Sequence, residues 1–233
     1  MLAIIAGTSL IESALFAAWK NTSVQTPYGG VTVKTDSKHW FLQRHGDPPM
    51  PPHRINHRAH IWALKMLKVT EIVAFNSVGS LKLKIEPAAL VLPHDFISPW
   101  DVPTMFDHEM RFTVPEMDTA LRSHLEGVCR ELGFDVVDGG VYIQTKGPRL
   151  ETKAEIRYLR RLGDIVGMTM ASEATLCTEV GLHYTSLCSV DNYCNGISKV
   201  PLTVKEIETN VLKNSERLES IINGIISKDF KNR

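Results

Sequence analysis

The sequence predicts an α/β fold, in which a central mixed β-sheet is flanked by α-helices in one domain over residues 1–233. Short apolar runs recur along the chain, and segments with helical spacing of apolar residues lie between several of them. This alternation is typical of α/β proteins with a largely parallel sheet. The chain shows no linker, repeat or low-complexity stretch, and 233 residues are enough to bury one substantial core.

The strand predictions rest on continuous apolar runs that end at turn residues. Leu2 to Ala6 is such a run, and it stops at Gly7-Thr8-Ser9, as expected for a buried strand that feeds a loop. Gly139 and Gly140 interrupt a later run. Strands are expected at residues 2–6, 31–33, 40–42, 71–75, 88–92, 136–143, 164–167 and 183–190.

The helix predictions rest on apolar residues at helical spacing and on start signals. Pro51-Pro52 predicts a helix start, because proline is tolerated in a first turn. Thr152 precedes a charged amphipathic segment. Helices are expected at residues 53–67, 121–132, 154–162 and 204–226, and the aromatic segment 95–113 is expected to be a surface loop.

Composition and charge exclude several classes of protein. Lys plus Arg and Asp plus Glu number 26 each, and this neutral balance argues against a nucleic-acid-binding protein. No run approaches the roughly 18 apolar residues that a membrane helix needs. The start of the chain lacks the basic region of a signal peptide. The four cysteines form no C-x-x-C pair, which favours a reduced, cytoplasmic setting over a disulfide scaffold.

Three polar clusters follow apolar strands: Gly7-Thr8-Ser9, residues 76–80 and the region of Asn192. In an open α/β sheet, ligands bind beyond the carboxyl ends of the strands, where such turns gather. Small residues let backbone N–H groups approach an anion, and hydroxyls add donors. Ordinary turn chemistry explains each cluster equally well when it is taken alone. The first cluster is too short for a dinucleotide-binding fingerprint or a Walker loop.

Arg44-His45 also follows an apolar strand. Arg offers paired planar donors suited to phosphate, and His can add another donor. The alternative is a solvated Arg beside a core His.

His53, His57 and His60 share one face of the helix expected at 53–67. Zinc sites usually add a carboxylate or Cys ligand, and Arg54 and Arg58 place positive charge nearby. Contact with a neighbouring subunit is therefore favoured over metal binding, and no metal is expected.

Glu151 and Asn192 are the most informative pair of polar residues. An amide donates and accepts at once, and a carboxylate accepts N–H groups, so the two together suit the edge of a heterocycle. For Glu151 alone, a place at a helix start, where the helix dipole stabilises a carboxylate, is the alternative.

Seven short runs occur in the order of a known family: Ile-Ala-Gly-Thr at 5–8, Thr-Pro-Tyr-Gly at 26–29, Arg-His-Gly at 44–46, Pro-Pro-His-Arg-Ile-Asn-His-Arg-Ala at 51–59, Asn-Ser-Val-Gly-Ser at 76–80, Gly-Pro-Arg-Leu-Glu-Thr at 147–152 and Gly-Met-Thr at 167–169. On these runs the chain resembles the trimeric purine nucleoside phosphorylase and methylthioadenosine phosphorylase family over nearly its whole length. Any one run would be weak, but the ordered set is specific.

The resemblance implies a phosphorylase fold, a homotrimer, and phosphorolysis, in which phosphate attacks C1′ of a purine nucleoside and releases the base. It implies no cofactor, metal or covalent nucleophile. By similarity, the phosphate-binding residues would be Thr8, Arg44, His45, Ser77 and Thr169. Met168 would pack against the sugar, Asn192 would bind the purine at N7, and Cys194 would belong to the substrate pocket. A neighbouring subunit would complete the sugar pocket, with Phe106 and His108 as candidates.

Three features of the sequence indicate the substrate within the family. Methylthioadenosine phosphorylases usually carry Thr-Asp-Tyr-Asp, which suits a 6-amino group, where this chain has Asp-Asn-Tyr-Cys at 191–194. Glu151 falls where 6-oxopurine phosphorylases have a base-binding Glu, and a carboxylate accepts the N1–H that adenine lacks. Ile207 stands where phosphorylases of ordinary nucleosides place a His near the 5′-hydroxyl. An unpartnered hydroxyl buried against Ile costs roughly 1–3 kcal/mol, so Ile207 suits a methylthio group.

The pattern is most similar to that of methylthioinosine phosphorylases. It predicts phosphorolysis of S-methyl-5′-thioinosine to hypoxanthine and 5-methylthioribose 1-phosphate, a purine salvage reaction. A general 6-oxopurine nucleoside phosphorylase, and then a methylthioadenosine phosphorylase, are the alternatives within the family. Ala6 and Ser9 stand where the family usually has Gly, which keeps a non-catalytic purine-binding protein as the alternative outside the enzymes.

Overall fold

A computed structural model describes residues 1–100 and 102–228. The strands form one 11-stranded mixed sheet: β1 (Leu2–Ala6), β2 (Lys20–Thr26), β3 (Gly29–Thr35), β4 (Trp40–Gln43), β5 (Glu71–Ser80), β6 (Leu90–Leu92), β7 (Asp95–Ile97), β8 (Val136–Asp138), β9 (Val141–Gln144), β10 (Ile165–Gly167) and β11 (His183–Tyr193). The α-helices are α1 (His57–Met66), α2 (Thr119–Glu131), α3 (Lys153–Leu159), α4 (Met170–Val180) and α5 (Val204–Ser227), and two 3₁₀ turns are η1 (Thr8–Leu10) and η2 (Pro52–Arg54). The predicted α/β fold with a central mixed sheet is confirmed.

The centre of the sheet consists of β1, β5 and β11. β5 pairs in parallel with β1 on one side and with β11 on the other. These strands are buried almost throughout, which is why they read as continuous apolar runs instead of alternating ones. β10 joins β5 in the antiparallel direction, and β2 and β3 form an antiparallel hairpin, so the sheet is mixed.

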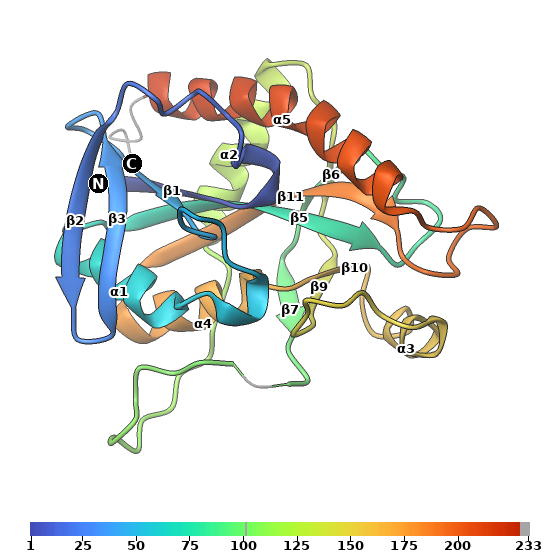
Figure 1. Ribbon diagram of the computed structural model, residues 1–233, viewed down its shortest axis with the longest axis horizontal. Coiled ribbons are helices and arrows are strands. Elements are labelled where there is room, and N and C mark those ends of the chain that lie inside the picture. Colours follow the sequence, from blue (N-terminus) through green and yellow to red (C-terminus); the bar gives the residue numbers. More distant parts are fainter. Residues whose placement is uncertain (101, 229–233) are drawn as a thin grey trace.

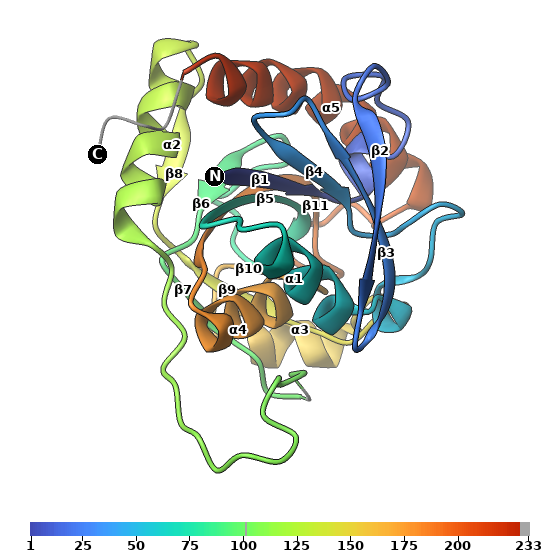
Figure 2. The same ribbon diagram turned by 90° about the vertical axis from the view of Figure 1, so that its left-hand side faces the viewer.

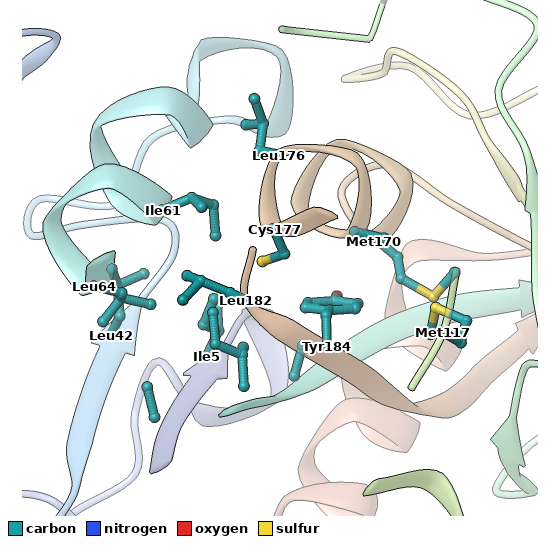
Figure 3. Packing of buried hydrophobic residues seen from close by; sticks show 14 of the residues in the cluster. Ile5, Leu42, Ile61, Leu64, Met117, Met170, Leu176, Cys177, Leu182 and Tyr184 are labelled. Atoms are coloured by element: carbon teal, nitrogen blue, oxygen red, sulfur yellow. The ribbon is translucent and has the colours of Figure 1, made fainter. Parts of the chain in front are cut away.

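Helices cover both faces of the sheet, with α1 and α4 on one face and α2 and α5 on the other (Figures 1 and 2). Successive side chains of β1 point to opposite faces of the sheet, because side chains alternate across a strand. They therefore pack into two hydrophobic cores, one on each face. Ile5 packs with Ile61 and Cys177 under α1 and α4 (Figure 3). Ile4 packs with Ile221 on the opposite face under α5. The two packed cores make the sheet a rigid support for the residues at its strand ends.

The structure corrects several predicted boundaries. The helix expected at 53–67 begins at His57, because the Asn56 side chain accepts a hydrogen bond from the Ala59 N–H at 3.0 Å and caps the helix there. His53 lies outside the helix, in η2. The segment expected to be a loop at 95–113 contains β7, and Thr104 and Met105 within it are hydrogen-bonded to Glu179 of α4. Helix α4 was not expected at all.

Two of the three predicted polar turns are also corrected. Residues 76–80 belong to β5 and Asn192 belongs to β11, and the two segments pair with each other. Their polar side chains therefore project from strands, and their backbones are engaged in the sheet. Gly7-Thr8-Ser9 does form a turn, at the start of η1. Within the described residues, no helix is both long and apolar enough to cross a membrane.

Candidate active site

A cavity of about 200 Å³ lies at the carboxyl-terminal ends of the parallel strands β1, β4, β5 and β11. This is where ligands bind in open α/β sheets. Its lining includes ten residues that the sequence placed in a binding role: Thr8, Arg44, His45, Ser77, Glu151, Met168, Thr169, Asn192, Cys194 and Ile207. Phe106 and His108, the candidates expected from a neighbouring subunit, do not line it within this chain. The fold thus brings these residues together, while their individual roles stay predictions.

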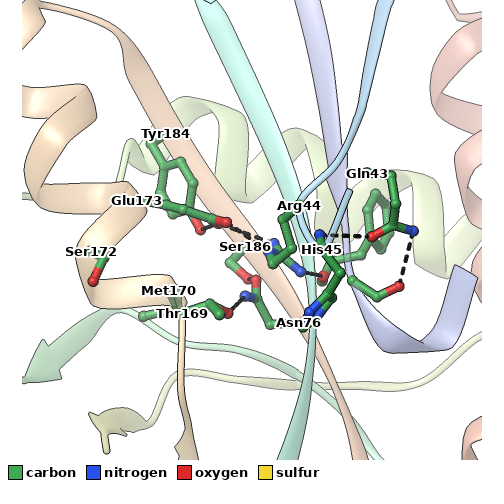
Figure 4. A network of polar contacts seen from close by, with 12 residues as sticks. Gln43, Arg44, His45, Asn76, Thr169, Met170, Ser172, Glu173, Tyr184 and Ser186 are labelled. Carbon is green, nitrogen blue, oxygen red and sulfur yellow. Dashed lines mark hydrogen bonds and ion pairs between the residues drawn. The ribbon is translucent and has the colours of Figure 1, made fainter. Parts of the chain in front are cut away.

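Arg44 lies beneath the cavity and is only 1% exposed. Its Nε and Nη2 donate to the two oxygens of Glu173 at 2.6 and 3.0 Å, and Nη1 donates to the Phe75 carbonyl at 2.6 Å (Figure 4). Burial lowers the pKa of Arg44, but the Glu173 carboxylate raises it above its usual value, so the side chain stays cationic. Of its five N–H groups three are engaged, which leaves two for an anion in the cavity. The alternative of a solvated Arg is therefore wrong.

Glu173 was missed by the sequence analysis. It is buried on α4 and also accepts a hydrogen bond from the Tyr184 hydroxyl at 2.8 Å. A single charged residue in the segment 170–177 was the available signal. Gly7 completes this arrangement, because a Cβ there would lie 2.5 Å from Nη1 of Arg44.

His45 contacts the Met50 carbonyl through Nδ1 at 2.7 Å. A carbonyl oxygen can only accept, so Nδ1 carries the hydrogen and Nε2 of the neutral ring is an acceptor. Burial, with the charge of Arg44, lowers the pKa of His45. Neutral His45 would thus accept a hydrogen bond from a protonated phosphate oxygen, where the residue type alone had suggested a donor.

Thr169 is oriented by a buried chain of side chains. Ser186 donates to Asn76 Oδ1 at 2.6 Å, and Asn76 Nδ2 donates to Thr169 Oγ1 at 2.8 Å (Figure 4). Because the Thr169 oxygen already accepts, its hydroxyl hydrogen is directed elsewhere and can donate to a ligand. Asn76 is thus a positioning residue that the sequence marked only as part of a polar cluster.

Replacing Asn76 with Leu is expected to raise the KM for phosphate by about 2- to 10-fold, equivalent to one hydrogen bond of about 0.5–1.5 kcal/mol. The reason is that the Thr169 hydroxyl loses the donor that orients it. Initial rates at varied phosphate measure the effect, and Ser186→Ala, which leaves the Asn76–Thr169 bond intact, is the control with a smaller change. A folded Asn76→Leu protein with unchanged phosphate KM would contradict the positioning role.

Glu151 is 8% exposed and accepts a hydrogen bond from the Thr145 hydroxyl on Oε1 at 2.7 Å. Its second oxygen remains for a ligand. Glu155 forms a capping box with Thr152, the N-cap of α3. Glu151 directly precedes Thr152, so it lies at a helix start, as the alternative had it, and lines the cavity as well.

Asn192 and Cys194 line the same cavity as Glu151. The Asn192 Nδ2 donates to the Tyr193 carbonyl at 2.9 Å, which leaves one amide hydrogen and Oδ1 available. Burial raises the pKa of Cys194, so this side chain is a neutral thiol. A Cβ on Gly79 would lie 2.6 Å from Cys194 Sγ and 3.3 Å from Asn192 Nδ2. Only glycine at position 79 leaves room for both side chains.

Another part of the cavity lining is apolar. Ile207 lines it together with Leu202 and Val211, which the sequence analysis missed, and Met168 also contributes. Val211 follows Ile207 by four residues on α5, so the two share a helix face. That spacing was the available signal.

The three histidines that shared a face of the expected helix do not form a metal site. His53 lies in η2, apart from α1, and the rings of His57 and His60 are 6.4 Å apart. Burial lowers the pKa of both His57 and His60 to about 3, so both are neutral. Among the described residues, no three His, Cys, Asp or Glu side chains are grouped to hold a metal ion.

Residues 1–227 match the model of the phosphorylase superfamily. The chain is 36% identical over 239 aligned residues, covering 100% of it and 98% of the relative, to an Archaeoglobus fulgidus protein named "Probable 6-oxopurine nucleoside phosphorylase". It is 39% identical over 245 residues, covering 99% and 85%, to a "Probable S-methyl-5'-thioinosine phosphorylase" of Methanothermobacter thermautotrophicus. Its fold superposes on methylthioadenosine phosphorylase from Schistosoma mansoni with a TM-score of 0.84, at 25% identity and with 98% and 93% of the two chains covered.

The chain belongs to the phosphorylase superfamily. The predictions of the family and of an enzyme of the purine nucleoside phosphorylase type are confirmed.

Proposed function

We propose that the protein cleaves S-methyl-5′-thioinosine with inorganic phosphate and releases hypoxanthine and 5-methylthioribose 1-phosphate. The observation that carries the proposal is the composition of one cavity. Cationic Arg44 and the hydroxyls of Thr8, Ser77 and Thr169 line it, as do Glu151 with a free carboxylate oxygen and apolar Ile207. The cation and the hydroxyls suit a phosphate anion, the free oxygen of Glu151 suits a base with an N1–H, and Ile207 suits an apolar substituent on the sugar.

In the proposed reaction, a phosphate oxygen attacks C1′ of the sugar while the C1′–N9 bond breaks and its electron pair passes to the purine. Arg44 and the Thr169 hydroxyl hold the anion against C1′, so that it stabilises the positive charge on the sugar. Asn192 donates its free N–H to N7, where negative charge develops, and Glu151 accepts the N1–H. The proposed reaction uses phosphate as a co-substrate and needs no cofactor.

A general 6-oxopurine nucleoside phosphorylase is the second candidate, favoured by the Archaeoglobus fulgidus relative of that name. The two candidates share the base and differ at the 5′ position of the sugar. Ile207, Leu202 and Val211 in the cavity lining favour the methylthio substituent.

A phosphate-dependent assay with methylthioinosine, inosine, guanosine and methylthioadenosine tests the proposal. We expect the highest kcat/KM for methylthioinosine, with inosine lower by about 5- to 150-fold, the equivalent of burying a hydroxyl without a partner at about 1–3 kcal/mol. A preference for methylthioadenosine would contradict the role of Glu151, and a preference for inosine would contradict that of Ile207. Tight binding without turnover at saturating phosphate would favour a non-catalytic purine-binding protein.

Replacing Ile207 with Thr is expected to reduce the preference for methylthioinosine over inosine by about 5- to 10-fold, because a hydroxyl then gains a partner worth about 1 kcal/mol. The ratio of the two kcat/KM values measures this change. Leu212→Thr, at a position on α5 that is 66% exposed, is the matched control and should leave the ratio unchanged. An unaltered ratio in Ile207→Thr would mean that the 5′ substituent of the nucleoside does not contact residue 207.

The assembly proposed from the family resemblance is a homotrimer. Sedimentation velocity of the purified protein tests it, and a monomer that turns over methylthioinosine would contradict it.

A further inference from the structure

Asp191 lies at a β-bulge in the cavity wall. β11 follows the register of β5 up to the pair Val190–Val78 and resumes it at Asn192–Gly79, so Asp191 is the extra residue. Adjacent residues of a regular strand point to opposite faces, yet Asp191 and Asn192 both line the cavity. Bulges re-aim a side chain in this way. The bulge therefore brings a carboxyl group into a site that is proposed to bind a dianion.

The carboxyl group of Asp191 accepts a hydrogen bond from α5. It is 2% exposed, and the Asn214 Nδ2 of α5 donates to its Oδ1 at 2.8 Å. The hydroxyls of Ser77 and Ser189 also lie close enough to this carboxyl group to lower its pKa. Ser77 Oγ shares a hydrogen bond with Ser9 Oγ at 2.7 Å. Ser77 thus lines the same cavity as Asp191 and belongs to the proposed phosphate-binding set.

Charged groups around this part of β11 have other partners. Arg44 is paired with Glu173, His45 contacts the Met50 carbonyl, Glu151 accepts from Thr145, and Arg217 of α5 donates to the Ala88 carbonyl. At the opposite end of β11, His183 contacts Asp118. Within the described part of the chain, no ion pair includes Asp191. Its charge is therefore offset by hydrogen bonds and not by a cation.

Burial raises the pKa of Asp191 to about 6, although the nearby polar groups of Asn214, Ser77 and Ser189 lower it. The carboxyl group therefore exchanges its proton near neutral pH. Asn214 Oδ1, on the same side chain that contacts Asp191, is buried without a hydrogen-bond partner among the described residues. A protonated Asp191 can donate to such an acceptor, whereas a carboxylate cannot.

We propose that anion binding in this cavity is coupled to protonation of Asp191, which takes up one proton from solvent when phosphate occupies the Ser77 end. The proposal rests on the proposed function, because it takes Ser77 as a phosphate ligand. A dianion at Ser77 and the Asp191 carboxylate would lie in the same cavity and repel each other, and a like charge of this kind disfavours the ionised form. Protonation removes that repulsion, and the proton returns to solvent when the anion leaves.

The coupling has a definite sign. Bound anion raises the pKa of Asp191 further, so the anion binds most tightly when the carboxyl group is already protonated, below about pH 6. As the pH rises above that value, affinity falls by up to tenfold per unit, the limit for one linked proton. Above the pKa of the anion-bound state, affinity no longer changes.

Isothermal titration calorimetry with sulfate tests the coupling, because sulfate stays a dianion between about pH 5 and 8 and its own protonation does not contribute. Titrations in buffers of different ionisation enthalpy count the protons taken up. We expect uptake approaching one proton near pH 7, and a sulfate Kd that rises up to tenfold per unit above pH 6. Asp191→Asn, which is similar in size and always neutral, should show a nearly flat Kd and little uptake. Any pH dependence of the sulfate Kd that remains in Asp191→Asn is attributed to His45.

Equal pH dependence in the wild type and in Asp191→Asn would overturn the coupling while leaving the phosphate site in place. A parallel titration with inorganic phosphate separates the two failures. If neither phosphate nor sulfate binds the wild type, the proposed function itself is wrong and the coupling falls with it.

Asn214→Leu provides an independent variant that keeps the Asp191 carboxyl group. Leu keeps the branched shape of Asn but has no polar atoms, so it removes a hydrogen bond that lowers the pKa of Asp191. We therefore expect the pH above which sulfate affinity falls to shift upward. A purely structural role for Asn214 would weaken binding equally at every pH, and that outcome would also overturn the coupling. Asp95→Asn, at an exposed position on β7, is the control and should titrate like the wild type.

Discussion

Replacing Arg44 with Met is expected to lower kcat/KM for phosphorolysis by about 10²- to 10³-fold, the loss typical of one donor to a developing or attacking anion. It is also expected to lower the free energy of unfolding by about 3–5 kcal/mol, because it leaves the Glu173 carboxylate buried without its partner. Phosphorolysis rates and urea unfolding measure the two effects separately.

A double variant separates the structural role of the pair from its role in binding. Replacing a buried ion pair by apolar residues of similar size is often neutral for stability. Arg44→Met combined with Glu173→Leu should therefore recover most of the lost stability, apart from the hydrogen bonds to Tyr184 and the Phe75 carbonyl. Activity should stay low. A stable double variant with wild-type turnover would show that the Arg44 cation is not needed for phosphorolysis.

Arg149→Met is the matched control for the loss of an Arg–Glu pair. Arg149 pairs with Glu155 at the surface and does not line the cavity. Ion pairs between exposed side chains contribute little to stability, so both the free energy of unfolding and the turnover of Arg149→Met should stay close to those of the wild type. The contrast tests whether burial is what makes the Arg44–Glu173 pair important.

Replacing Glu151 with Gln is expected to change the choice of base. In the variant, Oε1 can keep the hydrogen bond from Thr145, and the amide then presents N–H to the base in place of an acceptor. The N1–H of a 6-oxopurine meets a donor, whereas N1 of a 6-aminopurine can accept from it. A hydrogen bond to a charged group contributes about 1.5–3 kcal/mol, so kcat/KM for methylthioinosine should fall about 10- to 150-fold. Methylthioadenosine should be unaffected or improved.

The ratio of kcat/KM for the two nucleosides measures this change. Thr145→Val should shift the ratio in the same direction but less, because it frees the carboxylate without removing it. Glu155→Gln, which alters a nearby carboxylate that caps α3, should leave the ratio unchanged. An unchanged ratio in Glu151→Gln would mean that Glu151 does not contact the base.

The sequence predicted the central strands well for a physical reason. β1, β5 and β11 are buried on both faces, and such strands need apolar residues at almost every position. Helix α4 was missed because it too is buried nearly all round. Without a polar face it shows no helical period, and it follows the short strand β10 directly. The start of α1 was misplaced because Pro51-Pro52 marks η2, and the cap at Asn56 comes after it.

The candidate site was predictable as a set of residues but not as an arrangement. Short motifs identified the residues at the strand ends that line the cavity. Glu173 lies 129 positions from Arg44 in the chain, and Asn76 lies 93 positions from Thr169. No local spacing relates such partners. They meet because the strand order and register of the sheet place them together.

By itself, the sequence determined which central strands are buried and which polar residues lie at or near their carboxyl ends, because burial leaves a local pattern of residue types. Only the tertiary structure decided which polar groups face one cavity and in which state. It assigned the capping box to Glu155 and placed Glu151 in the cavity lining, set the hydrogen of His45 on Nδ1, and turned Asp191 inward at a bulge. These outcomes depend on hydrogen-bond partners and strand register, which are properties of the whole fold.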